Sequence, residues 1–563
     1  MAAAAWLGLP AIEEYNGLDL KKLPLNHAYA IANTTVEGIR IYAARDDCYK
    51  CPFEYQASLE PFKDTSWSFD TSVQMTWRAL QASGDFEYMS TDKKGGLICE
   101  MRPKLGEYGV YRIDIGLCGM SPEVEPVNTY LPLFLITFLF GIFVVGGLII
   151  KNRLRNKKAM RKDEEAEELT PTNESNEKRI TLHFFRGILF CLLVFAMSGG
   201  GGYPVFNRQW GDLSTADALF FMLTWTIGLN IPIVVDKAIK KGKSKFSIIG
   251  NVLKRASLLF FIGCVIDATV FLHKTWPKEN SSSLWCPLQM MAIAYFIVAS
   301  AYVLQVRKFV MKSKLFICRI FENVVSLMWC WLFTGILIGS LFTLMFSYIT
   351  LNCLGAELKD DEKEYSDLPR EVMNTCVDDF TNVFNRVCLG KGHGFVFING
   401  FYGFGGGLLG VITTIIHAMI GLKAGVIFVH YKSHRKRLNL WIFWGTLFGL
   451  TGILLGVGSH FFRENLWPIA TTLLFSSLAF LMYSLIYSLT NIYKYSISLI
   501  TVPGVTFLAL LPGHLLLVAS AKSTWDSGFF SSHFLYLFFS LGMVALWIVI
   551  GFVLKRYKFK IAV

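Results

Sequence analysis

Charged residues are scarce in this 563-residue chain, at 17% of the sequence, whereas 53% of the residues are hydrophobic. Soluble domains carry about 25% charged residues, so a soluble protein of this size is excluded. The sequence predicts instead a polytopic α-helical membrane protein. The net charge of +12 does not indicate a nucleic-acid partner, because the basic residues lie in short runs beside apolar segments, as in the cytosolic loops of membrane proteins.

Common catalytic and nucleotide-binding motifs are also absent. No P-loop, Rossmann glycine pattern, GxSxG elbow or HExxH occurs in a supporting context. The run GFGGGLLG (residues 403–410) opens a membrane segment, with no preceding strand and no Lys-Ser/Thr after it. No second CxxC or histidine cluster accompanies Cys48 and Cys51, so disulfides are favoured over half of a zinc site or a redox pair, and no metal is predicted.

Residues 1–125 contain no apolar run long enough to span a membrane. Polar residues there alternate with β-branched and aromatic ones, as in EGIRIYAAR and YGVYRIDIG, which predicts a small β-rich, sandwich-like domain. The domain carries one glycosylation sequon, at Asn33, and four cysteines: Cys48, Cys51, Cys99 and Cys118. These features suit an oxidising, non-cytosolic compartment. The first twelve residues are apolar but lack a basic leader, so a signal peptide is weak or absent.

About eleven transmembrane helices are expected from residue 129 onward. The apolar segments are centred near residues 140, 191, 225, 262, 296, 337, 418, 449, 478, 507 and 543. The expected organisation is a first transmembrane helix at 126–152, a charged and disordered cytosolic linker at 153–181, a ten-helix bundle at 182–555 with a luminal loop at 352–404, and a cytosolic tail at 556–563. No internal repeat is visible, which disfavours a transporter built from inverted halves.

The basic runs predict the orientation of the chain. KNRLRNKKAMRK, DKAIKKGKSK, VRKFVMKSK, YKSHRKR and KRYKFK all follow odd-numbered spans, whereas the other connections hold far fewer Lys and Arg. Basic loops stay in the cytosol, so the C-terminus is expected to be cytosolic and the N-terminal domain luminal. The sequon at Asn280 and the cysteines Cys286, Cys353, Cys376 and Cys388 fall on the same luminal side.

The most specific stretch covers residues 178–232, where two apolar segments flank four successive glycines (residues 199–202) and then Tyr203 and Asp217. Irregular backbone at membrane depth is tolerated where it lines a cavity or is buried in protein. The glycines therefore indicate either a ligand cavity or a tight interhelical loop without a ligand. Ionisable residues in spans are functional candidates by default, the alternative being pairs between helices. They are His183, Arg186, Asp217, Asp267, His417 and His514.

Several motifs in order resemble the heparan-alpha-glucosaminide N-acetyltransferase family. They are DDCYKCPF and CEMRPKLGEYGVYRI in the N-terminal domain, and FRG, GGGGY, KRASLLFFIG, PLQ, GLLGVITTIIHAMIGLKAG, ENLWPIATTLLFSSLAF and PGVTFLALLPGH in the membrane region. The resemblance implies a multipass lysosomal membrane protein that transfers acetyl from cytosolic acetyl-CoA to terminal glucosamine of luminal heparan sulfate. It also implies a homodimer in the bilayer.

The resemblance further indicates which residues bind the acetyl donor. By their places in the shared motifs they are Arg186, Gly199, Gly200, Gly201, Tyr203 and Gln289.

The family uses a histidine just after the glycine-rich turn, and here the chain reads YPVFNRQWGDL, with Asn207 and Arg208 where a Lys-His pair would lie. A guanidinium cannot accept a proton. We expect His183 or His514 to replace that base, with Asp217 as a further catalytic candidate. The alternative is a catalytically inactive descendant that binds or transports a small molecule through the same cavity. The replacement of polar family residues by Met197, Met290, Gly405, Thr506 and Leu515 favours this alternative.

Overall fold

The computed structural model describes residues 8–10, 12–45, 53–81, 97–139, 142, 146, 173–207, 215–272, 287–305, 327–348, 408–457, 467–493, 497–521 and 532–557. These residues belong to two compact units. The first unit combines Met1–Pro171 with Ser198–Gly211 and Thr524–Gly542, and the second contains Thr172–Met197, Asp212–Ser523 and Met543–Val563. The predicted luminal loop 352–404, Cys48, Cys51, Arg208 and the Asn280 sequon lie outside the described residues.

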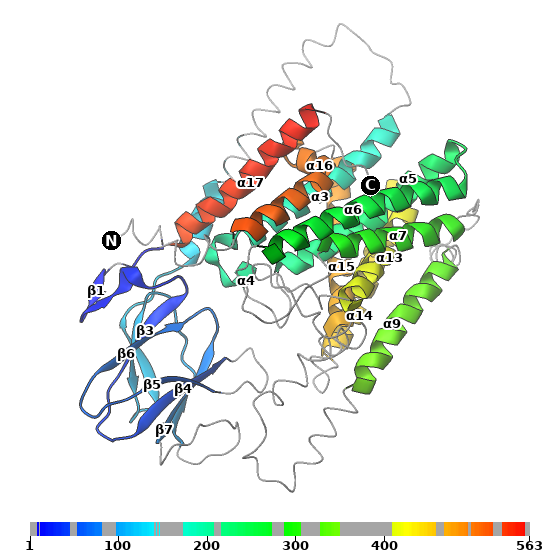
Figure 1. Cartoon of the computed structure of the whole chain (residues 1–563). Helices are drawn as coiled ribbons and strands as arrows, with labels where there is room; N and C mark the ends of the chain where they lie inside the picture. Colours follow the sequence, from blue (N-terminus) through cyan, green and yellow to red (C-terminus); the bar gives the residue numbers. More distant parts are fainter. Residues whose placement is uncertain are drawn as a thin grey trace. The chain divides into compact units, whose positions relative to one another are not determined.

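The first unit contains the β-rich domain that the sequence predicts (blue strands in Figure 1). One four-stranded sheet has the order β10-β9-β3-β6, in which β3 and β9 are parallel, and the other has the order β5-β4-β7-β8. A two-stranded sheet, β1-β2, precedes them. The strands are β1 (Glu14–Tyr15), β2 (Leu18–Asp19), β3 (His27–Ala32), β4 (Ile39–Arg45), β5 (Glu54–Ser58), β6 (Thr65–Asp70), β7 (Met75–Gln81), β8 (Leu97–Met101), β9 (Val110–Asp114) and β10 (Gly119–Val124).

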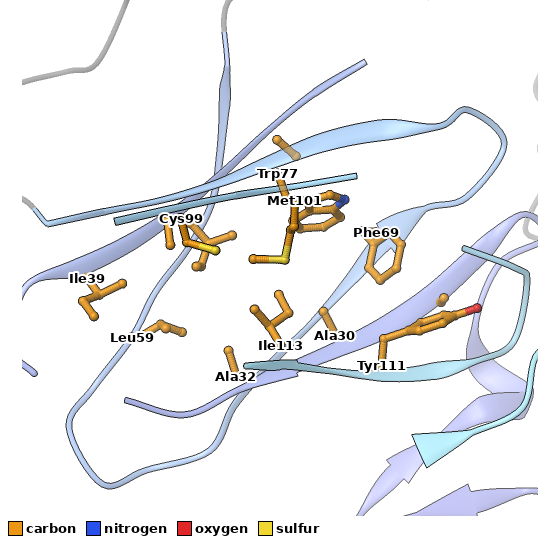
Figure 2. Packing of buried hydrophobic residues seen from close by; sticks show 14 residues of the cluster. Ala30, Ala32, Ile39, Leu59, Phe69, Trp77, Cys99, Met101, Tyr111 and Ile113 are labelled. Carbon is orange, nitrogen blue, oxygen red and sulfur yellow. The ribbon is translucent and has the colours of Figure 1, made fainter. Parts of the chain in front are cut away.

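The two four-stranded sheets share one apolar core (Figure 2). Side chains alternate between the two faces of a strand, so three alanines of β3 (Ala28, Ala30 and Ala32) and three residues of β4 (Ile39, Ile41 and Ala43) point into this core. Trp77 of β7 is fully buried and meets Phe69 of β6 edge to face, with ring centroids 5.0 Å apart. The alternation that predicted strands therefore also defines the inner faces of a β-sandwich.

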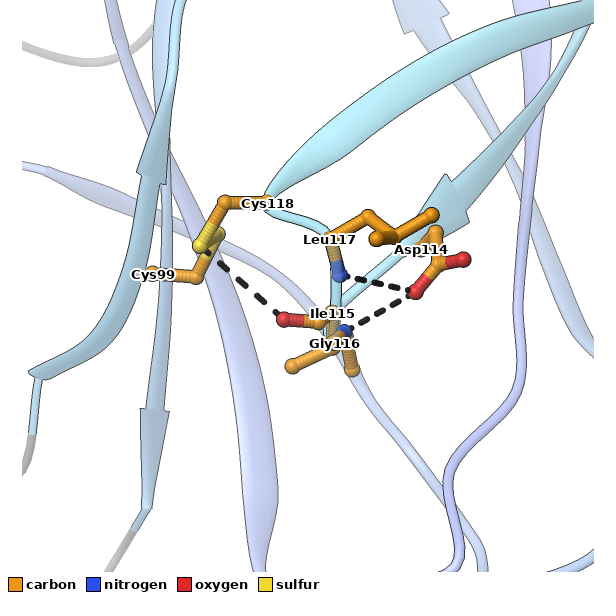
Figure 3. Close-up of a disulfide and its surroundings, with 6 residues drawn as sticks. All are labelled: Cys99, Asp114, Ile115, Gly116, Leu117 and Cys118. Atoms are coloured by element: carbon orange, nitrogen blue, oxygen red, sulfur yellow. Dashed lines mark hydrogen bonds between the residues drawn. A yellow bond between two sulfur atoms is a disulfide. The ribbon is translucent and has the colours of Figure 1, made fainter.

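A disulfide joins the two sheets of the sandwich (Figure 3). Cys99 lies in β8, and Cys118 lies in the turn that precedes β10. Asp114 holds this turn, since its Oδ1 accepts hydrogen bonds from the backbone N–H groups of Gly116 (2.9 Å) and Leu117 (3.1 Å). The structure thus pairs two of the four cysteines for which the sequence predicted disulfides.

The second unit is helical (Figure 1). Its helices are α3 (Asn173–Met197), α5 (Thr215–Lys240), α6 (Lys245–Leu272), α7 (Pro287–Gln305), α9 (Met328–Tyr348), α13 (Leu408–His430), α14 (His434–Val457), α15 (Trp467–Tyr487), α16 (Ser498–Ala521) and the later part of α17 (His533–Arg556). A π-helical turn, η4 (Ser488–Ile492), extends α15. Helix α3 begins at Asn173, inside the range 153–181 that was expected to be a linker.

Within the described ranges, nine helices are long and apolar enough to cross a membrane, and each covers one of the predicted span centres. Shorter apolar helices, Tyr130–Leu139 and Met328–Ser340, lie at or beside the other two centres, near residues 140 and 337. The predicted fold class, a polytopic membrane protein with an N-terminal β-rich domain, is therefore confirmed. The total of eleven spans stays a prediction.

Glycines allow two helix pairs of the second unit to pack with their backbones in close contact. A Cβ at Gly187 of α3 would lie 1.8 Å from the carbonyl oxygen of Ile500, and one at Gly504 of α16 would lie 1.7 Å from the carbonyl oxygen of His183. Between α5 and α13, a Cβ at Gly228 would lie 2.0 Å from the carbonyl oxygen of Ala418. Small residues at helix crossings are typical of membrane bundles.

Candidate functional site

Four successive glycines form a buried turn after α3, called here the glycine turn (residues 199–202). All four have positive φ, between 54° and 92°, and the last three form a short helical turn, η2 (Gly200–Gly202). The N–H of Gly202 donates to the carbonyl oxygen of Gly199 at 2.8 Å. Positive φ is strained for residues with a Cβ, so only glycine adopts this run of conformations readily.

The first turns of α17 hold the glycine turn from one side. Ser540 Oγ accepts a hydrogen bond from the N–H of Gly201 at 3.2 Å and lies 3.0 Å from the carbonyl oxygen of Ser198. A Cβ at Gly199 would lie 1.7 Å from the hydroxyl oxygen of Tyr536. The absence of side chains from the turn is therefore what lets α17 approach its backbone.

Residues of the N-terminal segment hold the glycine turn as well. Asn26 Nδ2 donates to the carbonyl oxygen of Gly202 at 3.0 Å, and the Tyr203 hydroxyl donates to the carbonyl oxygen of Thr129 at 2.9 Å. Burial raises the pKa of the Tyr203 phenol, so this group stays protonated and acts as a donor. Within the first unit, the glycine turn is thus fixed by partners far apart in the sequence.

The strongest of these connections is a buried pair formed by His533 and Glu107. His533 Nε2 lies 2.7 Å from Glu107 Oε2, and His533 Nδ1 lies 2.8 Å from the carbonyl oxygen of Gly201. The other oxygen of Glu107, Oε1, accepts the N–H of Asn26 at 2.6 Å. His533 is fully buried and Glu107 is 4% exposed, so water does not compete for these bonds. The His533 ring also stacks on Tyr203, with centroids 4.6 Å apart.

The hydrogen bonds of His533 leave neither ring nitrogen available as a base. A carbonyl oxygen only accepts, so Nδ1 must carry a proton that it donates to Gly201. The contact with Glu107 then holds one further proton, carried either by Nε2 or by the carboxyl group. In both forms each nitrogen is committed to a hydrogen bond. His533 and Glu107 are therefore suited to holding the glycine turn, not to removing a proton from a substrate.

The second unit places the predicted residues His183 and Arg186 one turn apart on α3. Arg186 is buried, and its Nε and Nη2 donate to the hydroxyl and carbonyl oxygens of Thr226 on α5, both at 3.0 Å. Its guanidinium carbon lies 4.7 Å from the centre of the Phe507 ring on α16. His183 Nδ1 lies 3.4 Å from the carbonyl oxygen of Gly504 on α16. Both residues therefore lie where α3 meets α16.

Gln289, another predicted binding residue, pairs with an acid. Its Nε2 donates to Asp267 Oδ2 at 2.9 Å, which joins the start of α7 to α6. The oxygen of the same amide, Oε1, is buried and has no hydrogen-bond partner among the described residues. The Gln289 amide is thus oriented by Asp267 and retains an unused acceptor.

His514 on α16 differs from the other histidines of the second unit. It is fully buried, it meets the Trp547 ring edge to face at 5.7 Å, and neither of its ring nitrogens has a hydrogen-bond partner among the described residues. His417, by comparison, places Nδ1 3.0 Å from Ser476 Oγ and stacks on Phe221. His514 therefore keeps a ring nitrogen available for a proton.

The predicted site residues are divided between the two units. Gly199, Gly200, Gly201 and Tyr203 come together in the first unit, whereas His183, Arg186, Gln289 and His514 belong to the second. The side chain of Asp217 lies outside the described residues. In the part of the chain that the structure describes, no group of three His, Cys, Asp or Glu side chains is arranged to hold a metal ion.

The sequence did not single out His533 and Glu107. Glu107 lies within the quoted stretch CEMRPKLGEYGVYRI, and His533 begins the last span on the side of the membrane expected for the glycine turn. These two positions in the sequence suggest that each residue lies on the same side of the membrane as the glycines. They do not predict that Glu107 and His533 contact each other.

Two curated proteins are similar to this chain over almost its whole length, although no family model matches it. The heparan-alpha-glucosaminide N-acetyltransferase of Mus musculus is 24% identical over an alignment of 618 positions, gaps included, that covers 98% of this chain and 90% of the relative. The protein of the same name from Homo sapiens is 22% identical over an alignment of 587 positions, covering 92% of this chain and 85% of the relative. These similarities along almost the whole chain support a divergent member of the heparan-alpha-glucosaminide N-acetyltransferase family.

Proposed function

We propose that this protein transfers the acetyl group of acetyl-CoA to the amine of a glucosamine residue in a glycan, in a lysosomal or related membrane. The proposal is supported by similarity to two N-acetyltransferases along nearly the full length of each chain. The reaction joins the amine nitrogen to the acetyl carbonyl carbon and breaks the carbon–sulfur bond of the thioester. The amine loses a proton and the CoA sulfur gains one, so acetyl-CoA and the amine give the acetamide and CoA.

The chemistry requires a base, because glucosamine reaches the site as an ammonium ion that cannot attack a carbonyl. A neutral imidazole suits this step, since its ordinary pKa of about 6.5 lies near the pH at which enzymes work. The chain has Asn207 and Arg208 where the family resemblance expects Lys-His. We therefore expect another histidine to accept the proton.

The single observation that carries the proposal is the state of His514. This imidazole is buried beside Trp547, with both ring nitrogens free of hydrogen bonds among the described residues. A ring nitrogen that makes no hydrogen bond to the protein can accept a proton from a substrate, which is what a base requires. His514 is thus our candidate for the base, and His183 is the second candidate.

The remaining predicted residues fit the binding of an acyl donor. The guanidinium of Arg186 supplies positive charge inside the bundle, where the polyanionic acetyl-CoA would benefit from it. The free acceptor of Gln289 suits an amide N–H of the donor's pantetheine arm. The glycine turn contributes differently, because Tyr536, Phe206 and Leu537 already occupy the space beside Gly199, Gly200 and Gly201.

The second candidate function is binding or transport of a small molecule without catalysis. The commitment of both His533 nitrogens to Gly201 and Glu107 favours it, because the histidine nearest the glycine turn is not available as a base. In this function the protein still binds a ligand, but no acetyl group is transferred.

Variants of two histidines distinguish the functions. His514→Gln is compared with the control His430→Gln. His430 is the last residue of α13, and its Nδ1 lies 3.0 Å from the carbonyl oxygen of Val426 in the same helix. Removing a positioned base lowers the rate about 10²–10⁴-fold. We expect His514→Gln to lose acetyl transfer to glucosamine to this extent while acetyl-CoA binding is kept. Equal transfer by both variants would exclude His514 and leave His183→Gln as the next test.

A further inference from the structure

Helices α5, α6 and α7 of the second unit line a partly open cavity of about 180 Å³. A cavity needs only about 10–15 Å³ to hold one water molecule, so this one accepts a much larger group. Most of its lining is apolar, and five side chains bring polar atoms to it: Asn230, Lys243, Asn251, Arg255 and Tyr295. The cavity lies beside the lysine-rich turn between α5 and α6, and its lining contains none of the residues that the sequence assigned to the acetyl-transfer site.

The polar lining of this cavity is positively charged. It includes the cations Lys243 and Arg255 and no acidic residue. The nearest acid along α5, Asp236, is occupied by Lys240, whose Nζ lies 2.7 Å from Asp236 Oδ2. Lys241 and Lys245 add further positive charge to the same turn. The cavity therefore attracts an anion.

The two cations reach the cavity from different parts of the chain. Arg255 on α6 lies beside Tyr295 on α7, and both side chains line the cavity. Lys243 belongs to the turn that precedes α6. An anion in the cavity would thus meet a guanidinium and an ammonium group.

We propose that this cavity binds a phosphate group. The planar guanidinium of Arg255 matches two phosphate oxygens, and Lys243 contributes a compact charge beside it. The phosphate has two possible carriers, the nucleotide part of the acyl donor and the headgroup of an anionic membrane lipid. The apolar remainder of the lining accommodates either carrier. The nucleotide carrier rests on the proposed function, whereas the lipid carrier does not.

The test compares the wild-type protein with the double variant Lys243→Gln/Arg255→Gln in nanodiscs. The matched control is Lys241→Gln, an exposed lysine in the same turn that does not line the cavity. One arm measures the Kd of 3′,5′-ADP and of CoA, and the other measures retention of phosphatidylglycerol against phosphatidylcholine by native mass spectrometry. Each hydrogen bond to a charged group is worth roughly a tenfold to hundredfold change in Kd.

A weaker Kd for the nucleotides in the double variant alone assigns the cavity to the nucleotide, and loss of phosphatidylglycerol retention alone assigns it to the lipid. The proposal is overturned if the double variant binds both probes as tightly as the wild-type protein does. It is also overturned if the wild-type protein binds neither probe. If the double variant does not fold, Arg255→Lys keeps the charge but removes the planar fork, and we expect several-fold weaker binding. Acetyl transfer is measured on the same samples, so loss of phosphate binding and loss of catalysis are told apart.

Discussion

His533 and Glu107 are separated by 426 residues, and their side chains meet at 2.7 Å in the interior of the first unit. The pair joins the first turn of the last helix to the β-rich domain, and through Gly201 it reaches the glycine turn. Because both side chains are buried, each would be left without a partner if the other were removed. The glycine turn therefore depends on a contact that forms only when both ends of the chain have folded.

Replacing Glu107 tests this dependence. Glu107→Ala leaves His533 Nε2 and the N–H of Asn26 without a partner, and breaking a buried pair in this way costs about 3–5 kcal/mol. Glu107→Gln should cost less, because its amide can donate to Nε2 of a neutral imidazole that still donates from Nδ1. We expect the thermal unfolding midpoints to rise in the order Ala, Gln, wild type.

The control for this series is Glu60→Ala. Glu60 pairs with Lys63 on the surface, where solvent screens the two charges, so losing this pair should change the stability very little. An equal midpoint for Glu107→Ala and Glu60→Ala would contradict the assigned role of the His533–Glu107 pair.

Glycine substitutions separate backbone strain from packing in the glycine turn. Gly201 (φ +73°) and Gly242 (φ +76°) have nearly the same backbone conformation, but a Cβ at Gly201 would lie 2.6 Å from Leu537 Cδ1, whereas nothing lies within 4 Å of one at Gly242. Both alanine variants carry the strain of positive φ, about 1–2 kcal/mol. We expect Gly201→Ala to lower the unfolding midpoint clearly further than Gly242→Ala. Equal shifts would show that α17 does not pack tightly on the glycine turn.

The disulfide between Cys99 and Cys118 provides a test of orientation. Disulfides form in oxidising compartments, and this one closes a loop of 19 residues, for which about 2–4 kcal/mol of stabilisation is typical. In intact cells we expect Cys118, the exposed member of the pair, to resist a membrane-permeable maleimide until a reductant is added, and Cys99→Ser to free Cys118 for labelling. Labelling of the wild type without reductant would place the domain in the cytosol, against the orientation that the basic loops predict.

The pH dependence of the β-rich domain should reveal the environment of Glu123. Arg112 and Tyr15 both donate to its carboxylate and lower the pKa of that carboxyl below its ordinary value of 4.5. A lowered folded-state pKa stabilises the fold above pH 4.5, and this contribution is lost as the pH falls through the lowered value. We expect Glu123→Gln to weaken the hydrogen-exchange protection of β10 at pH 7, with the difference from wild type vanishing in strong acid.

The matched control for the pH series is Glu13→Gln. Glu13 is mostly exposed, and its carboxylate pairs with Lys21 on the surface. A difference in β10 protection that persists unchanged at low pH would show that the Glu123 carboxylate is not responsible for it.

Most of the fold could be predicted from hydrophobic runs and from the alternation of polar and apolar residues, because both are local properties of the sequence. Apolar runs of span length predicted the nine membrane-capable helices, and period-two patterns such as EGIRIYAAR predicted strands that line the sandwich core. The start of α3 was harder to predict, because the charged residues around Asn173 are typical of a disordered linker. Helix ends depend on local capping and packing that hydropathy does not measure.

The candidate site was only partly visible in the sequence, because its central contacts are long-range. Four adjacent glycines indicate an unusual turn in the sequence, and all four have positive φ in the structure. Their partners Glu107 and His533 lie in segments far from them along the chain, and no periodicity links such segments. Whether a histidine has a partner, as His533 does and His514 does not, depends on the same long-range packing.

The most direct test of the proposed activity is acetyl transfer by the purified wild-type protein. Acetyl-CoA with a ¹³C-labelled acetyl group is incubated with glucosamine, and N-acetylglucosamine and free CoA thiol are quantified together. We predict equal amounts of labelled N-acetylglucosamine and CoA, formed well above the rate without protein. Saturable binding of acetyl-CoA with no labelled product above that rate would contradict the enzymatic function and support the binding or transport function.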